Sequence, residues 1–296
     1  MADDEAAAVR TQLVRTAVEV LEGTARHAET TISTHDGTPS AGSAAQREIS
    51  ADDDGTLDAP WMPRPGYDAH GTATLMILTA ADHLRGHARV LLPEPPTIWA
   101  PRTIARASLE NTARAAWLLD PAITYRDRVI RYVNDSLYSL WEARRAGFSL
   151  TGGRDPAERV EEIVAWANLR AIPVSRPKDP LRSPVGLGDG RRNATRVLDD
   201  LLDEFGKAAY REFSALAHAT LSGLMNMVEP AGDGDDDRGE IAVKPEVVIT
   251  VAATAFMVFM AGFERLLAQY GWSPDLSASW KLSCIRRMRP FLPRSE

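Results

Sequence analysis

The chain has 296 residues, of which 44% are hydrophobic and 25% are charged, and its formal net charge is -7 at pH 7. These values exclude a disordered chain and predict a globular protein that buries a sizeable core without disulfides or a structural metal. The acidic charge argues against binding nucleic acid through overall charge, so such binding would need a local basic patch. A single cysteine, Cys284, excludes an internal disulfide and an all-cysteine zinc site.

The N-terminal sequence MADDEAAAVR is acidic and lacks the basic and apolar regions of a secretory signal. Together with the low cysteine content, this predicts a cytoplasmic protein. Residues 247–263 form an uncharged run of 17 residues, at the short limit for crossing a bilayer. Because Ala, Thr and Gly dilute the hydrophobicity of this run, we expect a buried core helix and no membrane association.

Apolar residues at three- and four-residue spacings predict a series of helices, and no period-two alternation predicts a sheet. The first helix, in residues 1–32, precedes a segment over residues 33–70 that is rich in Gly, Ser, Pro and Asp and is typical of a long linker. Further helices are expected over residues 72–92, 102–119, 125–147, 156–171, 192–205, 210–228, 246–270 and 277–288, with a Pro- and Gly-rich loop over residues 172–190. The expected fold is all-α: a bundle of long antiparallel helices in residues 71–296, with the N-terminal helix on a long linker.

The predicted helix over residues 210–228, YREFSALAHATLSGLMNMV, carries no charge after Glu212. Arg211, Ser214 and His218 fall opposite its apolar face, but no Lys or Gln accompanies them there. We therefore expect both faces of this helix to be covered by other parts of the protein.

A buried arginine on that helix needs a carboxylate partner, because an uncompensated buried charge is strongly destabilising. The predicted helix over residues 102–119 offers Glu110, which lies between Arg106 and Arg114 at four-residue intervals on one face. We expect Glu110 to pair with Arg211, so that the two helices meet along a polar seam.

Arg211 and His218, separated by six residues, resemble the arginine–histidine signature of the HEPN superfamily. The resemblance implies a metal-independent RNA-cleaving or RNA-binding protein of toxin or defence type, which works as a homodimer without a cofactor. His218 would move protons at the ribose 2′-hydroxyl and Arg211 would stabilise the phosphate charge, supported by Arg106, Glu110 and Ser214. Glu212 departs from the pattern, because active members often carry Asn, Asp or His there.

Two longer stretches, RASLENTARAAWLLDP and YREFSALAHAT, resemble uncharacterised actinobacterial helical proteins. That similarity implies no activity. The alternative function is therefore a non-catalytic helical interaction protein, in which the polar residues of the seam form an internal hydrogen-bonded network that fixes the register of the helices.

Two histidines, His83 and His87, lie one helical turn apart, which is the spacing that two imidazole ligands of one transition metal need. A third ligand would have to come from elsewhere. Ordinary histidines at the edge of the apolar face are the alternative.

The sequence DDLLDE is similar to the aspartate-rich magnesium motif of class I terpene synthases, with Asp199, Asp200 and Asp203 as ligands. A further alternative function is therefore a magnesium-dependent, terpene synthase-like cyclase. NDSLYSLWE, residues 134–142, has the outline of the second metal motif, but it precedes the aspartates. The alternative to magnesium binding is a solvated helix surface, because the leucines between the aspartates define a core face.

Two basic stretches, RDRVIR at residues 126–131 and KLSCIRRMRPFLPR at residues 281–294, are candidates for contact with RNA phosphates. The alternatives are that these arginines pair with the acidic loop GDGDDDRGE at residues 232–240, or that they cap helix C-termini.

Overall fold

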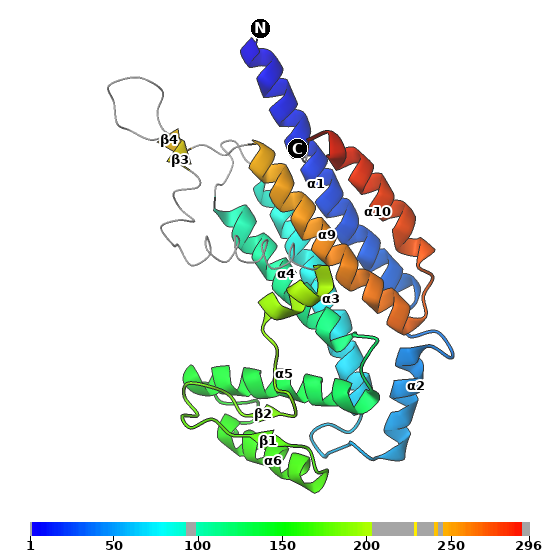
Figure 1. The fold of residues 1–296 in the computed structure, drawn as a ribbon, viewed down its shortest axis with the longest axis vertical. Coiled ribbons are helices and arrows are strands. Elements are labelled where there is room, and N and C mark those ends of the chain that lie inside the picture. Colours follow the sequence, from blue (N-terminus) through cyan, green and yellow to red (C-terminus); the bar gives the residue numbers. More distant parts are fainter. Residues whose placement is uncertain (1, 93–98, 203–227, 230–239, 242–244, 292–296) are drawn as a thin grey trace.

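The computed structural model describes residues 2–92, 99–202, 228–229, 240–241 and 245–291 (Figure 1). The protein is all-α, as predicted, and the described long helices follow the expected order, while the helix expected over residues 210–228 lies outside the described residues. The long helices are α1 (Ala2–Thr34), α3 (Pro65–Val90), α4 (Ala100–Leu118), α5 (Tyr125–Arg145), α6 (Pro156–Leu169), α9 (Pro245–Tyr270) and α10 (Asp275–Met288), and residues 194–202 are also helical. The shorter ones are α2 (Ala44–Ser50) and the 3-10 turns η1 (Ala51–Asp54) and η2 (Arg289–Phe291).

Two pairs of very short strands were not expected from the sequence. β1 (Val174–Ser175) pairs antiparallel with β2 (Gly186–Leu187), and β3 (Val228–Glu229) pairs antiparallel with β4 (Glu240–Ile241). Each strand has two residues, so these pairs close loops and do not build a layer.

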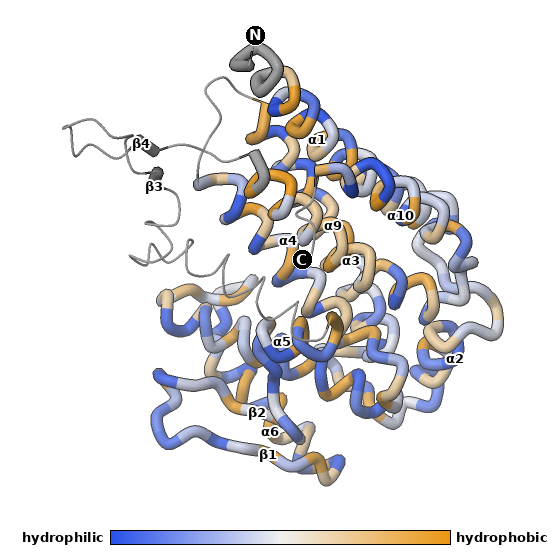
Figure 2. The backbone as a smooth tube through the Cα atoms, turned by 45° about the horizontal axis from the view of Figure 1, so that its top comes forward, coloured by the Kyte–Doolittle hydropathy of each residue, from blue (hydrophilic) through white to orange (hydrophobic). Residues whose placement is uncertain are grey.

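The main bundle consists of α1, α3, α4, α9 and α10, which lie side by side, while α5 and α6 lie across one end of it (Figure 1). Its centre is α9, which contacts α1, α3 and α4 and places Phe256, Phe259 and Phe263 fully out of solvent. Figure 2 shows α9 as a mostly hydrophobic tube, in contrast to the hydrophilic loop around β1. Burial of these aromatic rings stabilises the bundle.

The apolar run in α9 occupies the core, where the sequence placed it. Within the described ranges, Val247–Tyr270 is the one helix that has the length and composition to cross a membrane, but 67% of its most apolar window is buried inside the protein. At Gly262, a side chain would place its Cβ 2.4 Å from Thr112 Cγ2 of α4. The glycine therefore allows α9 and α4 to approach closely.

A second, smaller core lies between α5 and α6. Val133 and Leu137 of α5 pack with Ile163 and Trp166 of α6, and Met62 covers them. The helices are fixed by local capping: Thr124 and Asp127 form a capping box at the start of α5, and Asp155 accepts a hydrogen bond from Ala157 N at the start of α6.

The prediction of a long linker over residues 33–70 was wrong. This segment contains α2, η1 and the first turns of α3, and it buries Ala45, Asp52 and Met62. Its polar residues are caps and turns: Ser43 caps α2, and the Asp52 carboxylate accepts hydrogen bonds from the backbone N–H groups of the first turn of α3.

The N-terminal helix is correspondingly not a separate unit. α1 packs against α3, α9 and α10, and its residues Val20 and Leu21 are fully buried in the main core. The division into residues 1–32, 33–70 and 71–296 is therefore replaced by one main bundle that begins with α1 and a smaller core built around α5 and α6.

Candidate functional site

The predicted polar face of α4 is present in the structure. Arg106 Nε donates a hydrogen bond to Glu110 Oε1 over 2.9 Å, and the two side chains are 19% and 33% exposed. Glu110, which was expected to pair with Arg211, thus has an arginine partner on its own helix. Arg114, two turns after Arg106, points into a cavity beside α5 and α6.

The other side of the predicted polar seam is the helix expected over residues 210–228. Arg211, Ser214 and His218 lie outside the described residues, so their meeting with Glu110 stays a prediction.

The two histidines of the proposed metal pair, His83 and His87, lie in different environments. His87 is fully buried and neither ring nitrogen has a hydrogen-bond partner within the described ranges, whereas His83 is half-buried. Burial lowers the pKa of His87 to about 4, so the ring is neutral at physiological pH. Among the residues that the structure describes, no group of three His, Cys, Asp or Glu side chains is arranged to hold a metal ion. Cys284 is also buried, and burial raises the pKa of its thiol to about 11.

The proposed magnesium ligands that the structure describes lie on the surface or contact other residues of the protein. Asp200 is exposed and forms an ion pair of 2.5 Å with Arg192, Asp199 is half-buried, and Asp203 lies outside the described residues. In the second motif, the Asn134 side chain donates to Leu187 O and accepts from Leu187 N, at 2.9 and 2.8 Å. These contacts hold the β1–β2 loop against α5.

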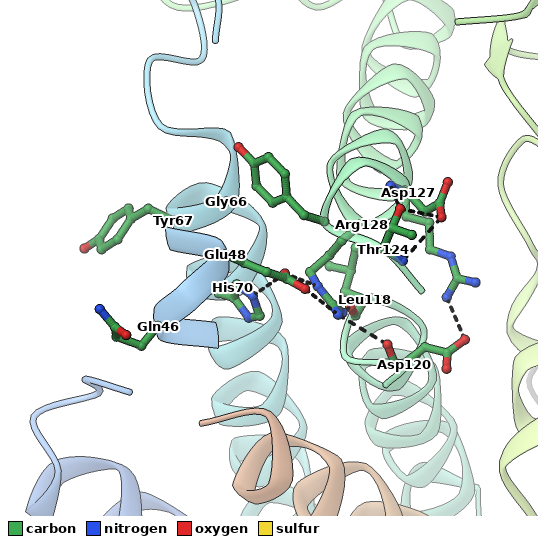
Figure 3. Close-up of polar contacts among 12 residues, drawn as sticks. Gln46, Glu48, Gly66, Tyr67, His70, Leu118, Asp120, Thr124, Asp127 and Arg128 are labelled. Carbon is green, nitrogen blue, oxygen red and sulfur yellow. Dashed lines mark hydrogen bonds and ion pairs between the residues drawn. The ribbon is translucent and has the colours of Figure 1, made fainter. Parts of the chain in front are cut away.

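A buried polar junction around Arg128 was missed by the sequence analysis. Arg128 of α5 is almost fully buried and forms a bidentate ion pair with Glu48 of α2 (Figure 3). Arg128 Nε donates to Glu48 Oε2 over 2.6 Å, and Nη2 donates to Oε1 over 3.2 Å. His70 of α3 donates from Nε2 to the same Glu48 Oε2 over 2.9 Å, because a carboxylate can only accept. The three residues join α2, α3 and α5 at one point.

Burial alone would raise the pKa of Glu48. The hydrogen bonds from His70 and Arg128 outweigh this effect and lower the pKa below its ordinary value. Glu48 is therefore ionised, as its pairing with Arg128 requires.

Arginines also cap the C-terminal end of α4. Arg128 donates to the carbonyl oxygens of Leu118 and Asp120 (Figure 3). Arg131 donates to Trp117 O over 2.5 Å, and Arg265 of α9 donates to Ala116 O over 2.9 Å. These cations satisfy carbonyls that a helix end leaves free and oppose the negative end of the helix dipole.

A second contact completes this junction. The Asp52 Oδ1 atom accepts from Gly66 N at 2.7 Å and from the Tyr125 hydroxyl at 2.6 Å, which links the starts of α3 and α5. Burial, and then the hydrogen bond to Asp52, raises the pKa of Tyr125. In the sequence, Arg128 and Arg131 gave a signal only as part of the basic stretch RDRVIR, and the structure assigns both to helix capping.

Two cavities flank α3 on either side of Thr72 and Tyr132. One, of about 680 Å³, is lined by α2, the start of α3 and the loop after α1, and includes Asp68 and Tyr67. The other, of about 440 Å³, is lined by α3, α5 and α6 and receives Arg114 from α4. No protein-family model, curated protein or solved structure matches this chain.

Proposed function

We propose that this chain is a HEPN-like helical protein that binds RNA and cleaves it without a metal ion, acting as a homodimer in the cytoplasm. Arg211 and His218 are the proposed catalytic pair. The observation that supports this assignment is the half-buried ion pair between Arg106 and Glu110 on α4. It places a fixed carboxylate and a guanidinium on a helix whose buried positions include four alanines and two leucines, Ala105, Leu109, Ala113, Ala115, Ala116 and Leu118.

The chemistry of the proposed reaction needs a proton carrier and a positive charge. His218 removes the proton from the ribose 2′-hydroxyl, the 2′-oxygen bonds to phosphorus, and the bond from phosphorus to the 5′-oxygen breaks. The leaving 5′-oxygen takes a proton from water, His218 returns its proton to the solvent, and Arg211 stabilises the charge on the phosphate oxygens. Glu110 and Arg106 are positioning residues in this scheme, because their mutual hydrogen bond fixes the orientation of both side chains.

The alternative is a non-catalytic helical interaction protein. It is supported by the same contact, since a carboxylate already paired with Arg106 also serves simply to stabilise α4. In that case His218 and Arg211 would contribute to folding and not to a reaction. The two proposals predict different effects of removing the His218 imidazole: a loss of RNA cleavage in the first and a loss of stability in the second.

Incubation of the protein with end-labelled single-stranded RNA in the presence of EDTA tests the proposal. We expect cleavage that falls by about 100-fold or more in His218→Ala and Arg211→Ala, because general acid–base and electrostatic contributions have this size. The melting temperature should stay close to that of the unaltered protein.

The matched control is His83→Ala, which removes a half-buried imidazole from α3 and should leave cleavage unchanged. Absence of cleavage by the unaltered protein, or equal cleavage by His218→Ala, contradicts the proposal. A fall in melting temperature in His218→Ala, with no RNA cleavage by any form, supports the interaction protein instead.

A further inference from the structure

The cavity of about 440 Å³ beside α5 has the size of a small-molecule site. Its apolar wall is formed by Trp61, Met76, Leu140, Leu150 and Ile163, which come from the 57–62 segment, α3, α5, the following loop and α6. Parts of the chain that are distant in sequence therefore converge on it. A ligand with an apolar body would bury its surface there.

Arg114 supplies a cation without a partner. Its side chain is half-buried and lines the cavity, and it forms no hydrogen bond or ion pair with any other residue in the described part of the chain. The other arginine of the lining, Arg159, is already paired with Glu162 over 2.8 Å and lies over the ring of Trp61. An anionic group would therefore be bound by Arg114, whose planar guanidinium suits a carboxylate.

Asp135 supplies an acceptor in the same lining. The residue is 9% exposed, and its Oδ1 atom accepts from Arg191 Nε over 2.6 Å. Its Oδ2 atom is buried and has no hydrogen-bond partner among the residues that the structure describes. Because a buried carboxylate oxygen without a donor is destabilising, a donor group on a ligand would be bound favourably at this position.

We propose that this cavity binds a small carboxylate that carries a large apolar body and an amino group, the chemical class of the large apolar amino acids. The carboxylate pairs with Arg114, the amino group donates to Asp135 Oδ2, and the apolar body packs against Trp61 and Leu140. This site is independent of the proposed RNA chemistry, which uses neither Arg114 nor Asp135.

Isothermal titration of the full chain with three related probes tests the proposal. L-Tryptophan has all three features, indole-3-propionate lacks the amino group, and tryptamine lacks the carboxylate. We expect L-tryptophan to bind with a dissociation constant of about 1 mM or below and indole-3-propionate about tenfold more weakly. Tryptamine should bind weakest, because it lacks the carboxylate that pairs with Arg114 and brings a second positive charge into the same cavity.

Variants locate the site. Arg114→Gln should weaken L-tryptophan binding by about tenfold or more and leave tryptamine binding no weaker. Arg144→Gln, which changes an exposed arginine at the end of α5, is the matched control and should bind as the unaltered protein does. Ser139→Trp places a large ring on an exposed position at the cavity and should abolish binding without lowering the melting temperature.

Failure of L-tryptophan to bind at about 10 mM overturns the proposal, as does equal affinity for tryptamine. Unchanged binding of L-tryptophan by both Arg114→Gln and Ser139→Trp places the ligand elsewhere and also overturns it. Because Ser139 is exposed, its variant remains informative if Arg114→Gln folds poorly.

Discussion

His87 is a buried ionisable group whose charge state affects folding. It lies in the core on α3, and neither ring nitrogen has a hydrogen-bond partner in the part of the chain that the structure describes. Burial lowers its pKa to about 4, whereas an exposed histidine titrates near 6.5. Between these two pH values the unfolded chain binds a proton at this site and the folded chain does not.

Stability should therefore depend on pH through His87. Above about pH 6.5 the residue has no effect, and the free energy of unfolding falls as pH drops from about 6.5 towards 4. We expect the loss at pH 5 to be about 2 kcal/mol relative to pH 7, and His87→Leu to remove it. Urea unfolding of both proteins at the two pH values measures this difference.

The matched control for that experiment is His83→Leu, because His83 is half-buried on the same helix. Its pH dependence should follow the unaltered protein. The same loss of stability in His87→Leu as in the unaltered protein would contradict the burial of a neutral imidazole.

At the scale of elements, the junction around Arg128 determines how the helices meet. The guanidinium joins Glu48 of α2 to the C-terminal carbonyls of α4, and His70 of α3 joins the same carboxylate. α5 thus starts at a fixed place against three other helices. The small core between α5 and α6, and the cavity beside it, depend on this placement.

Arg128→Met should lower the free energy of unfolding by about 3 kcal/mol, because it leaves Glu48 as a largely buried carboxylate without its cation and frees the α4 carbonyls. Denaturant unfolding with far-ultraviolet circular dichroism measures the change. Arg144→Met, at an exposed position of the same helix, should change stability by less than about 0.5 kcal/mol. Equal effects of the two substitutions would show that the junction does not stabilise the protein.

The sequence predicted the long helices well, because each carries an apolar stripe of helical period that is buried in the fold. α4, α5, α6, α9 and α10 begin and end close to the expected residues. The sequence predicted that α3 starts at residue 72, but the helix starts at Pro65. Its first turn is capped by the Asp52 carboxylate, which lies 14 residues before Gly66 in the chain. Such a cap depends on tertiary structure and leaves no local pattern.

At the scale of the whole molecule, the all-α class followed from periodicity, but the roles of the charged residues did not. The pairing of Arg106 with Glu110 is local and was visible as a shared helix face. The contacts of Arg128 with Glu48 and of Arg191 with Asp135 join residues 80 and 56 positions apart, so no spacing rule indicates them. The composition of residues 33–70 also suggested a linker, although polar residues of this segment cap the helices α2 and α3.

The proposed function joins this fold to a reaction at the ribose 2′-hydroxyl. Mass spectrometry of the fragment ends, after incubation of single-stranded RNA with the protein in EDTA, tests it most directly. Attack by the 2′-oxygen leaves a 2′,3′-cyclic phosphate on one fragment and a 5′-hydroxyl on the other, and DNA of the same sequence stays intact because it lacks the nucleophile. Intact RNA, or fragments that end in a 3′-hydroxyl and form only when magnesium is added, would contradict the proposal.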